Sequence, residues 1–439
     1  MAPVAAKRSL LLSLLLLAGG AMSAAAHPNV LGFADAEYQF VCFSELNGWA
    51  EDDHTQVFAG FRKSCERILK GRDQPGDRPM EKALRAVCPR ALAVPKEADA
   101  ATIKKFLEEN FRPVLISKLG EGTGLLTGYY EPEVEGSREL TKGFTYPLYR
   151  RPPELISKAR LGLRNFRPGF PSTAGAGHRV NGKFTDYHDR AAIEDGALAN
   201  RGLEIVWLRD PAEAFFIQIQ GSARIRLTDG TMMRVNYSAH NGHPYTAIGR
   251  PLVEKGILLR EELSMENIRM FIAENPEEGR ELMRMNRAFT FFRVIDNLPP
   301  ESEAVGAQGI PLVKDRSIAV DQKLHVYGSL FWIESNLHFE NTKQPQAFNH
   351  LMVAQDTGSA ILGVARADIY FGGGAEAGAR AGRIRNPGKF FLLVPNEIDP
   401  VKIAANENIP EPEPRPKPEK EEKKEPPKAQ AQPKGAKKK

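Results

Sequence analysis

The chain has little cysteine, almost no net charge in its central part and only one long apolar run. It contains 3 cysteines in 439 residues, with no CxxC pair and no zinc-type spacing, which argues against a structural metal centre. No internal repeat with a period of 20 to 50 residues is visible, so a solenoid or propeller is not expected.

The three cysteines leave their pairing open. Cys65 and Cys88 lie 23 residues apart in a region with helical periodicity, and an oxidising compartment would allow them to pair. Cys42 with Cys65 is the alternative pair, and three free buried thiols are the remaining reading.

The basic sequence pI of 8.9 arises at the two ends of the chain. Residues 410–439 carry a net charge of +4 and the N-terminal segment adds +2, so the body between them is close to neutral. A neutral body gives no reason to expect a nucleic-acid-binding face.

The long apolar run lies at the N-terminus, where Lys7 and Arg8 precede "SLLLSLLLLAGGAM" and an Ala24-Ala25-Ala26 site. This arrangement is typical of a secretory signal peptide cleaved before His27, and the run is short for a membrane span of ~20 residues. An uncleaved anchor is the alternative. Since the run lacks a lipobox cysteine, we expect an exported, periplasmic protein that is not a lipoprotein.

Periodicity divides the body into four blocks. Apolar steps of three and four predict helices over 40–120 and 254–288, whereas short alternating runs predict strands over 122–253 and 289–394. "AFFIQIQGSARIRLTDGTMMRVNYSA" is interpreted as strand-like, with a hairpin turning at Asp229-Gly230. About 380 body residues indicate two domains, and one arrangement has the first β block inserted between two halves of the other domain.

"AQDTGSAILG", with Asp356, is reminiscent of the active-site loop of an aspartic peptidase. Such an enzyme needs two carboxylates sharing a proton, and a two-lobed one carries the motif twice. Here the motif occurs once, and Gln355 stands where that motif prefers an apolar residue. We therefore reject the peptidase interpretation.

Two further aspartates lie in apolar, strand-like surroundings, Asp321 in "SIAVDQKLHVYG" and Asp368 in "ARADIYFGGG". Partial desolvation raises the pKa of a carboxyl group and suits a general acid. The alternative is that all three aspartates accept backbone hydrogen bonds in turns, which aspartate does commonly.

Long ordered stretches now make the chain recognisable, among them "LTGYYEPEVEGS", "FFIQIQGSARIRLTDG", "VNYSAHNGHPYTAIGRPL", "SIAVDQKLHVYGSLFWI" and "ADIYFGGGAEAGARAG". The sequence resembles the membrane-bound lytic murein transglycosylase A family over nearly all of its body. It departs from the family in lacking the lipobox cysteine and in carrying a Pro/Lys/Glu-rich tail.

The resemblance implies a mainly β fold with flanking helices: a six-stranded double-psi β-barrel, a second inserted β-barrel domain, and a glycan groove between them. We expect a signal peptide at 1–26, the first part of the main domain at 27–130, the inserted domain at 131–271, the second part with the three aspartates at 272–398, and a disordered tail at 399–439.

The resemblance also implies a peptidoglycan lytic exotransglycosylase. Such a lyase cleaves the β-1,4 bond between N-acetylmuramic acid and N-acetylglucosamine without water and leaves a 1,6-anhydro end, in cell-wall turnover. Asp368 falls on the general acid/base, and Asp356 and Asp321 fall on the other two aspartates of the family. We expect Asp356 to support Asp368 by orienting it or raising its pKa.

The candidate substrate-binding residues are Asp321, Thr127, Gly128, Tyr129, Tyr130, Gln218, Gln220 and Ser222, although some of them are as easily core residues. No cofactor or metal is expected, and His240 and His243 in "HNGHPY" are interpreted as polar loop residues. The expected partner is the glycan strand, bound by a monomer without nucleic acid and without a membrane span in the mature form.

Deleting residues 410–439 should leave activity on soluble glycan strands unchanged. The segment has no apolar cluster with which to dock, and its interleaved charges predict only weak, screened attachment to the envelope. Turnover and envelope binding across a salt series measure this, and a marked loss of turnover on soluble strands would show that the segment packs into the fold.

Overall fold

The computed structural model describes residues 33, 35–71, 78–157, 175–299, 301–339 and 344–398. The predicted signal peptide and tail lie outside the described residues. Among the described residues, no helix combines the length and the apolar character that crossing a membrane requires.

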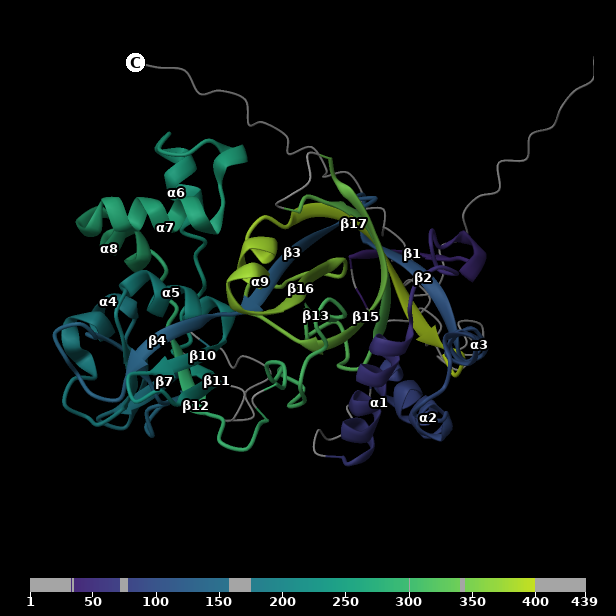
Figure 1. The fold of residues 1–439 in the computed structure, drawn as a ribbon, viewed down its shortest axis with the longest axis horizontal. Coiled ribbons are helices and arrows are strands. Elements are labelled where there is room, and N and C mark those ends of the chain that lie inside the picture. Colours follow the sequence, from purple (N-terminus) through teal and green to yellow (C-terminus); the bar gives the residue numbers. More distant parts are fainter. Residues whose placement is uncertain are drawn as a thin grey trace, which may run out of the picture. The chain divides into compact units, whose positions relative to one another are not determined.

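The main domain is a closed six-stranded β-barrel (Figure 1). Its strands are β3 (Gly124–Glu131), β13 (Ser317–Val320), β14 (Leu330–Leu337), β15 (Gln346–Asp356), β16 (Arg366–Gly373) and β17 (Arg385–Pro395). They pair in the order β17, β14, β15, β13, β16, β3, and β17 then pairs with β3 to close the circle. β1 (Ala36–Phe40) and β2 (Phe111–Lys118) extend the sheet from the other half of β17.

Three helices cover one side of the barrel: α1 (Thr55–Leu69), α2 (Pro79–Ala93) and α3 (Ala100–Asn110). Their apolar faces pack on Trp332 of β14, Val353 of β15 and Phe391 of β17. Asp99 caps α3 by accepting a hydrogen bond from the Thr102 amide at 2.8 Å. The predicted helices between residues 40 and 120 are thus present, although β1 and β2 flank them.

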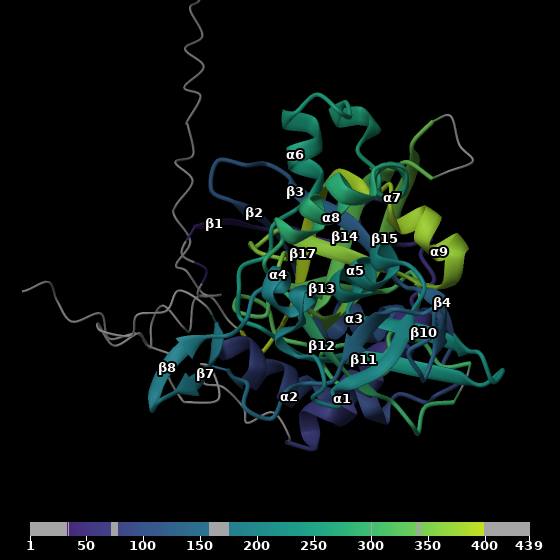
Figure 2. The ribbon, with the colours of Figure 1, turned by 90° about the vertical axis from the view of Figure 1, so that its left-hand side faces the viewer.

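The second domain is inserted between β3 and β13, as Figures 1 and 2 show. Its sheet runs in the order β12 (Thr290–Val294), β11 (Met232–His240), β10 (Ser222–Leu227), β4 (Glu133–Ser137), β9 (Glu204–Leu208) and β5 (Tyr146–Tyr149). A bridge between Arg150 and Phe292 joins the two outer strands. The predicted fold class is therefore confirmed. The predicted domain boundaries stay predictions. One strand of this sheet, β12, lies beyond residue 271, where the inserted domain was predicted to end.

The remaining elements of the inserted domain are short. They are β6 (Ile156–Ser157), β7 (Ala176–Val180), β8 (Lys183–Asp186), α4 (Arg190–Ala192), η3 (Ile193–Ala197), α5 (Pro211–Gln220), α6 (Gly249–Glu254), η4 (Arg260–Glu262), α7 (Met265–Glu274) and α8 (Pro276–Arg284). α7 and α8 confirm the helical block predicted over 254–288, whereas α6 ends at Glu254 and so lies almost entirely in the block predicted as strands. Residues of α5 to α8 share one apolar cluster.

The hairpin prediction is confirmed, because β10 and β11 pair antiparallel on either side of Gly230, whose φ is 86°. The strand prediction for "AFFIQIQ" is wrong, since these residues belong to α5. Asp210 caps this helix, Pro211 opens it and Gly221 ends it with a φ of 84°. These local signals outweigh the alternating pattern of apolar side chains.

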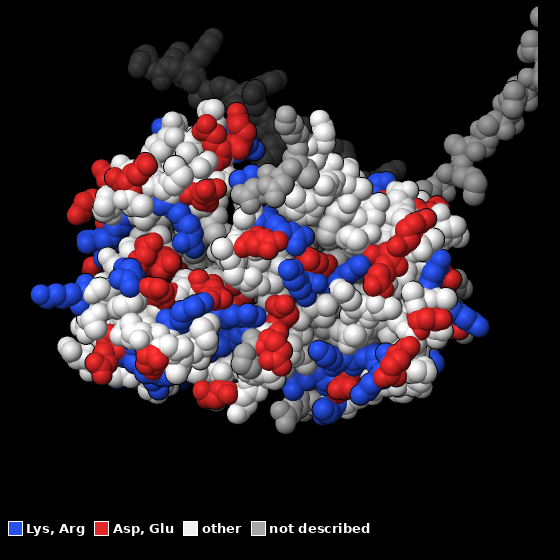
Figure 3. All heavy atoms as spheres, viewed as in Figure 1, with Lys and Arg blue, Asp and Glu red and all other residues white. Residues whose placement is uncertain are grey.

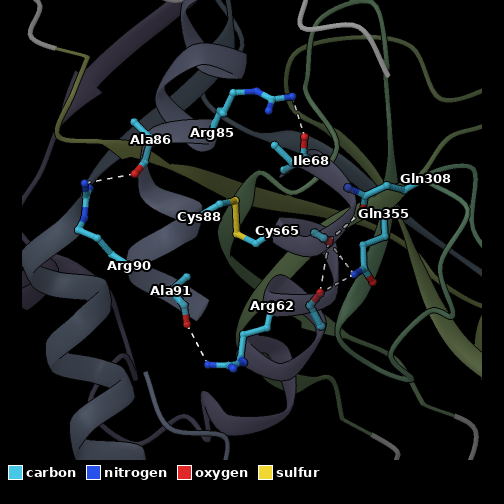
Figure 4. Close-up of a disulfide and its surroundings, with 12 residues drawn as sticks. Arg62, Cys65, Ile68, Arg85, Ala86, Cys88, Arg90, Ala91, Gln308 and Gln355 are labelled. Carbon is cyan, nitrogen blue, oxygen red and sulfur yellow. Dashed lines mark hydrogen bonds between the residues drawn. A yellow bond between two sulfur atoms is a disulfide. The ribbon is translucent and has the colours of Figure 1, made fainter. Parts of the chain in front are cut away.

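Figure 4 shows a disulfide between Cys65 of α1 and Cys88 of α2, whereas Cys42 is free and exposed. The structure thus selects the first of the pairings that the sequence left open. The bond ties together two helices that pack on the barrel.

Replacing both paired cysteines, Cys65→Ala with Cys88→Ala, should lower the free energy of unfolding by about 3 kcal/mol, because a loop of this length is no longer closed in the unfolded chain. Urea denaturation measures this. Cys42→Ser is the control and should stay within about 0.5 kcal/mol of the wild type. An equal loss in the control would contradict this pairing.

Candidate active site

Asp356 and Asp368 lie on the two strands that flank β13, at the same level of the barrel. Ala319 of β13 pairs with Asp356 of β15 on one side and with Asp368 of β16 on the other. Two strand spacings separate the two backbones by about 10 Å. Strand register thus brings together two residues that the sequence had proposed as a pair.

Asp368 is supported by one residue of the neighbouring strand β3 and by one residue of its own strand, β16. Its Oδ1 accepts a hydrogen bond of 2.7 Å from the hydroxyl of Thr127, which sits beside it in β3. The same hydroxyl accepts a bond of 2.7 Å from Nη2 of Arg366. Burial raises the pKa of Asp368, while the charge of Arg366 and the Thr127 hydroxyl oppose that rise. A carboxyl group so placed holds its proton to higher pH than an exposed aspartate.

Asp356 is held by three donors. Tyr129 Oη donates to its Oδ2 at 2.8 Å, and the amides of Ala307 and Thr357 donate to Oδ1 at 2.9 Å each. Burial nevertheless raises the pKa of Asp356 to about 6, and the charge of Asp368 adds to that rise. The expected turn at "DTGS" begins here, where β15 ends.

Asp321 has other hydrogen-bond partners than Asp356 and Asp368. Its Oδ1 accepts from the Lys323 amide and its Oδ2 from the Gly363 amide, each at 3.0 Å. It therefore ties the loop after β13 to the loop before β16. This agrees with the alternative interpretation of the aspartates, in which they accept backbone hydrogen bonds in turns. Its predicted contact with substrate stays a prediction.

The "TGYY" motif divides by strand alternation. Thr127 and Tyr129 contact the aspartates, whereas Gly128 and Tyr130 pack against α9 (Gly374–Ala381). A Cβ on Gly128 would lie 2.6 Å from the Phe371 ring, so this position is reserved for packing. The first pair thus faces the aspartates and the second faces α9, and the predicted contacts of all four residues with substrate stay predictions.

The three predicted residues of the inserted domain are engaged with protein groups. Gln218 is buried and its Oε1 accepts from Arg190 Nη2 at 2.8 Å. Gln220 Oε1 accepts from the Tyr130 amide at 3.1 Å, which ties α5 to β3. Ser222 is buried at the start of β10. Their predicted contacts with substrate stay predictions.

The histidines of "HNGHPY" bond to backbone groups. His240 Nδ1 accepts from the Gly242 amide at 2.9 Å, and His243 Nε2 lies 2.7 Å from the Tyr187 carbonyl oxygen. Across the described part of the chain, no three His, Cys, Asp or Glu side chains gather as ligands for a metal ion.

Sequence reasoning missed Arg366 and Tyr245. Arg366 stands two residues before Asp368 on one strand, so alternation alone could have predicted that the two side chains are neighbours. Tyr245 belongs to the inserted domain, and the charge of Asp368 contributes to its raised pKa after burial. Only the folded structure reveals that proximity.

Family models match two parts of the chain, "MltA specific insert domain" at residues 125–293 and "3D domain" at residues 316–394. The chain is 34% identical to a membrane-bound lytic murein transglycosylase from Agrobacterium tumefaciens of known structure, with a TM-score of 0.73, covering 84% of this chain and 99% of that one. The chain belongs to the membrane-bound lytic murein transglycosylase A family.

The Escherichia coli member of this family is informative both as a sequence and as a structure. Membrane-bound lytic murein transglycosylase A of Escherichia coli K12 is 32% identical over 275 residues, covering 62% of this chain and 66% of that protein, just under two thirds. A structure of the E. coli protein contains bound chitohexaose, at 26% identity and a TM-score of 0.56, covering 76% of this chain and 89% of that one.

Tyr129→Phe should raise the pKa of Asp356 above about 6. The Tyr129 hydroxyl donates to the charged carboxylate and stabilises it, and the variant lacks this hydrogen bond. Carboxyl ¹³C shifts across a pH titration measure this. Tyr130→Phe is the matched control, since that hydroxyl lies against Met265 Sδ at 3.9 Å instead. An equal shift in both variants, or in neither, would contradict the assignment.

Proposed function

We propose that this protein is a lytic transglycosylase that cleaves the β-1,4 bond between N-acetylmuramic acid and N-acetylglucosamine in peptidoglycan and leaves a 1,6-anhydromuramic end. The observation that carries the proposal is that Asp368 and Asp356 lie on either side of β13, each opposite Ala319, in a chain of this family. Chitohexaose bound to the E. coli relative supports a β-1,4-linked amino sugar as the ligand.

In this mechanism Asp368 acts twice. Its carboxyl group first donates its proton to the glycosidic oxygen as the bond from that oxygen to C1 breaks. The C6 hydroxyl oxygen of the same muramic residue then bonds to C1, and its proton passes to the Asp368 carboxylate. The raised pKa of Asp368 suits the first step, and restoring the proton readies the enzyme for another cycle.

One acid/base is sufficient because the nucleophile belongs to the substrate. Ordinary glycosidases use a second carboxylate to activate water or to attack C1. An intramolecular hydroxyl held in line can have an effective molarity on the order of 10⁵ M or more, so no water need be activated. Asp356, held by Tyr129 and by the Ala307 amide, is then free to support Asp368, with the sugar ring passing over Thr127 and Tyr129.

The inserted domain supplies the opposite wall of the binding site in this proposal. The charge of Asp368 contributes to the raised pKa of Tyr245, and Gln220 accepts a hydrogen bond from the Tyr130 amide of β3. Peptidoglycan as substrate places the protein in the cell envelope, in line with the predicted signal peptide at residues 1–26 and periplasmic location.

Asp368→Asn should lower the rate of anhydro-product release from purified sacculi by about 10³-fold, because the amide cannot donate or take the proton. Asp356→Asn is the comparison and should cost less, since its role is supporting. Muropeptide mass spectrometry measures both variants. Activity of Asp368→Asn at the wild-type rate would refute the assignment and make Asp356 the next candidate.

A further inference from the structure

Gln355, the residue that did not suit the peptidase motif, is a β-bulge next to the candidate site. In the pairing of β15 with β13, Ile318 is opposite Ala354 and Ala319 is opposite Asp356, so Gln355 is the extra residue. A bulge re-aims the side chain that follows it, which here is Asp356. Gln355 itself is fully buried.

The side chain of Gln355 is bonded at both ends. Its Oε1 accepts from the Ser317 hydroxyl at 2.6 Å, and its Nε2 donates to the Gly60 carbonyl and the Ser64 hydroxyl oxygen at 3.0 Å each. The bulge on β15 is thereby attached both to β13 and to helix α1.

The backbone of Gln355 positions the loop over residues 304–313. Its carbonyl oxygen accepts from the Gln308 amide at 3.1 Å, and a Cβ on Gly306 would lie 2.5 Å from the same oxygen. The adjacent residue of this loop, Ala307, donates its amide to Asp356. The bulge and the loop are thus hydrogen-bonded to each other, and the loop in turn donates to the carboxylate of Asp356.

Helix α1 completes the network. The Ser64 hydroxyl donates to Gln308 Oε1 at 2.8 Å and accepts from Gln355, and its neighbour Cys65 forms the disulfide with Cys88. Figure 4 shows Gln308 and Gln355 beside that disulfide. A rigid, covalently tied helix is therefore the support on which this end of β15 rests.

We propose that Gln355 is a positioning residue, which fixes the bulge of β15 and the 304–313 loop so that the Ala307 amide remains bonded to Asp356. This inference rests on the proposed function, in which Asp356 supports the reaction. A fully satisfied buried amide with partners on two other segments, β13 and α1, specifies one arrangement of those segments, whereas an apolar side chain would not.

Loss of the Ala307 donor should raise the pKa of Asp356, because that bond favours the charged form. The other titratable groups that act on Asp356 are Tyr129 from β3 and Asp368 from β16, and Arg366 acts on Asp368. Because Asp356 supports the reaction as a carboxylate in this proposal, the acidic limb of the pH profile should then move to higher pH.

The test compares two matched serine variants. Ser317→Ala removes the hydroxyl that bonds Gln355 and that also accepts a hydrogen bond from the Val313 amide of the loop at 2.7 Å. Ser335→Ala removes a hydroxyl of another buried serine, on β14, which donates to the Pro387 carbonyl at 2.7 Å. Gln355→Met, a stronger change of similar length, accompanies them. For each variant, kcat, KM and the pH profile are measured on soluble glycan strands, with the folded fraction from circular dichroism.

We expect Ser317→Ala to lower kcat about 3-fold and Gln355→Met about 10-fold, with KM nearly unchanged and the acidic limb shifted upward in both. Ser335→Ala should keep the wild-type profile. If Ser317→Ala matches Ser335→Ala and its activity follows the folded fraction, Gln355 merely packs and the inference is wrong. If instead the wild type releases no anhydro product, the proposed function fails.

Discussion

The barrel closes where β3 pairs with both β16 and β17, and the candidate site depends on this closure. Thr127 of β3 lies 241 residues before Asp368 of β16 in the chain, yet the parallel register places the two residues directly beside each other. A one-residue slip in that register would turn Thr127 and Tyr129 away from the aspartates and present Gly128 and Tyr130 instead. Gly128 opposes such a slip, because its close packing against Phe371 leaves no space for a side chain.

The same strand carries the main connection to the inserted domain. Glu131 at its end is fully buried and pairs with Arg224 at 2.8 Å and Arg234 at 3.0 Å, both from the β10–β11 hairpin. Burial raises the pKa of Glu131, and the two arginine charges oppose that rise. Because an unpaired buried charge is costly, this arrangement holds the hairpin against the end of β3.

On the molecular surface, acidic and basic side chains are interspersed over the face seen in Figure 3.

Much of this fold was predictable, because its signals are local or belong to long family motifs. Alternation and the Asp-Gly turn predicted β10 and β11, and apolar periodicity predicted α1 to α3. The error at α5 came from weighting alternation above the Asp210-Pro211 start and the Gly221 stop. The three aspartates were found from their apolar surroundings, but their different partners depend on strand register, which no local pattern contains.

The least predictable features join distant segments. In the sequence, Gln355 stood out only as a polar residue where the peptidase motif prefers an apolar one. Its partners Gly60, Ser64 and Ser317 belong to two other elements, α1 and β13. Tyr245 and the ion pairs of Glu131 depend on how the inserted domain meets the barrel. Sequence spacing does not encode such contacts, because each one requires the closure of a long loop.

The central claim is that Asp368 serves as acid and then base for an attack by the substrate's own hydroxyl, so that water does not take part. Digestion of purified sacculi in ¹⁸O-labelled water, followed by mass spectrometry of the released muropeptides, tests this directly. The account predicts anhydro ends that are lighter than reducing ends by one water and carry no label. Labelled reducing ends as the main product would show a hydrolase and would contradict the account.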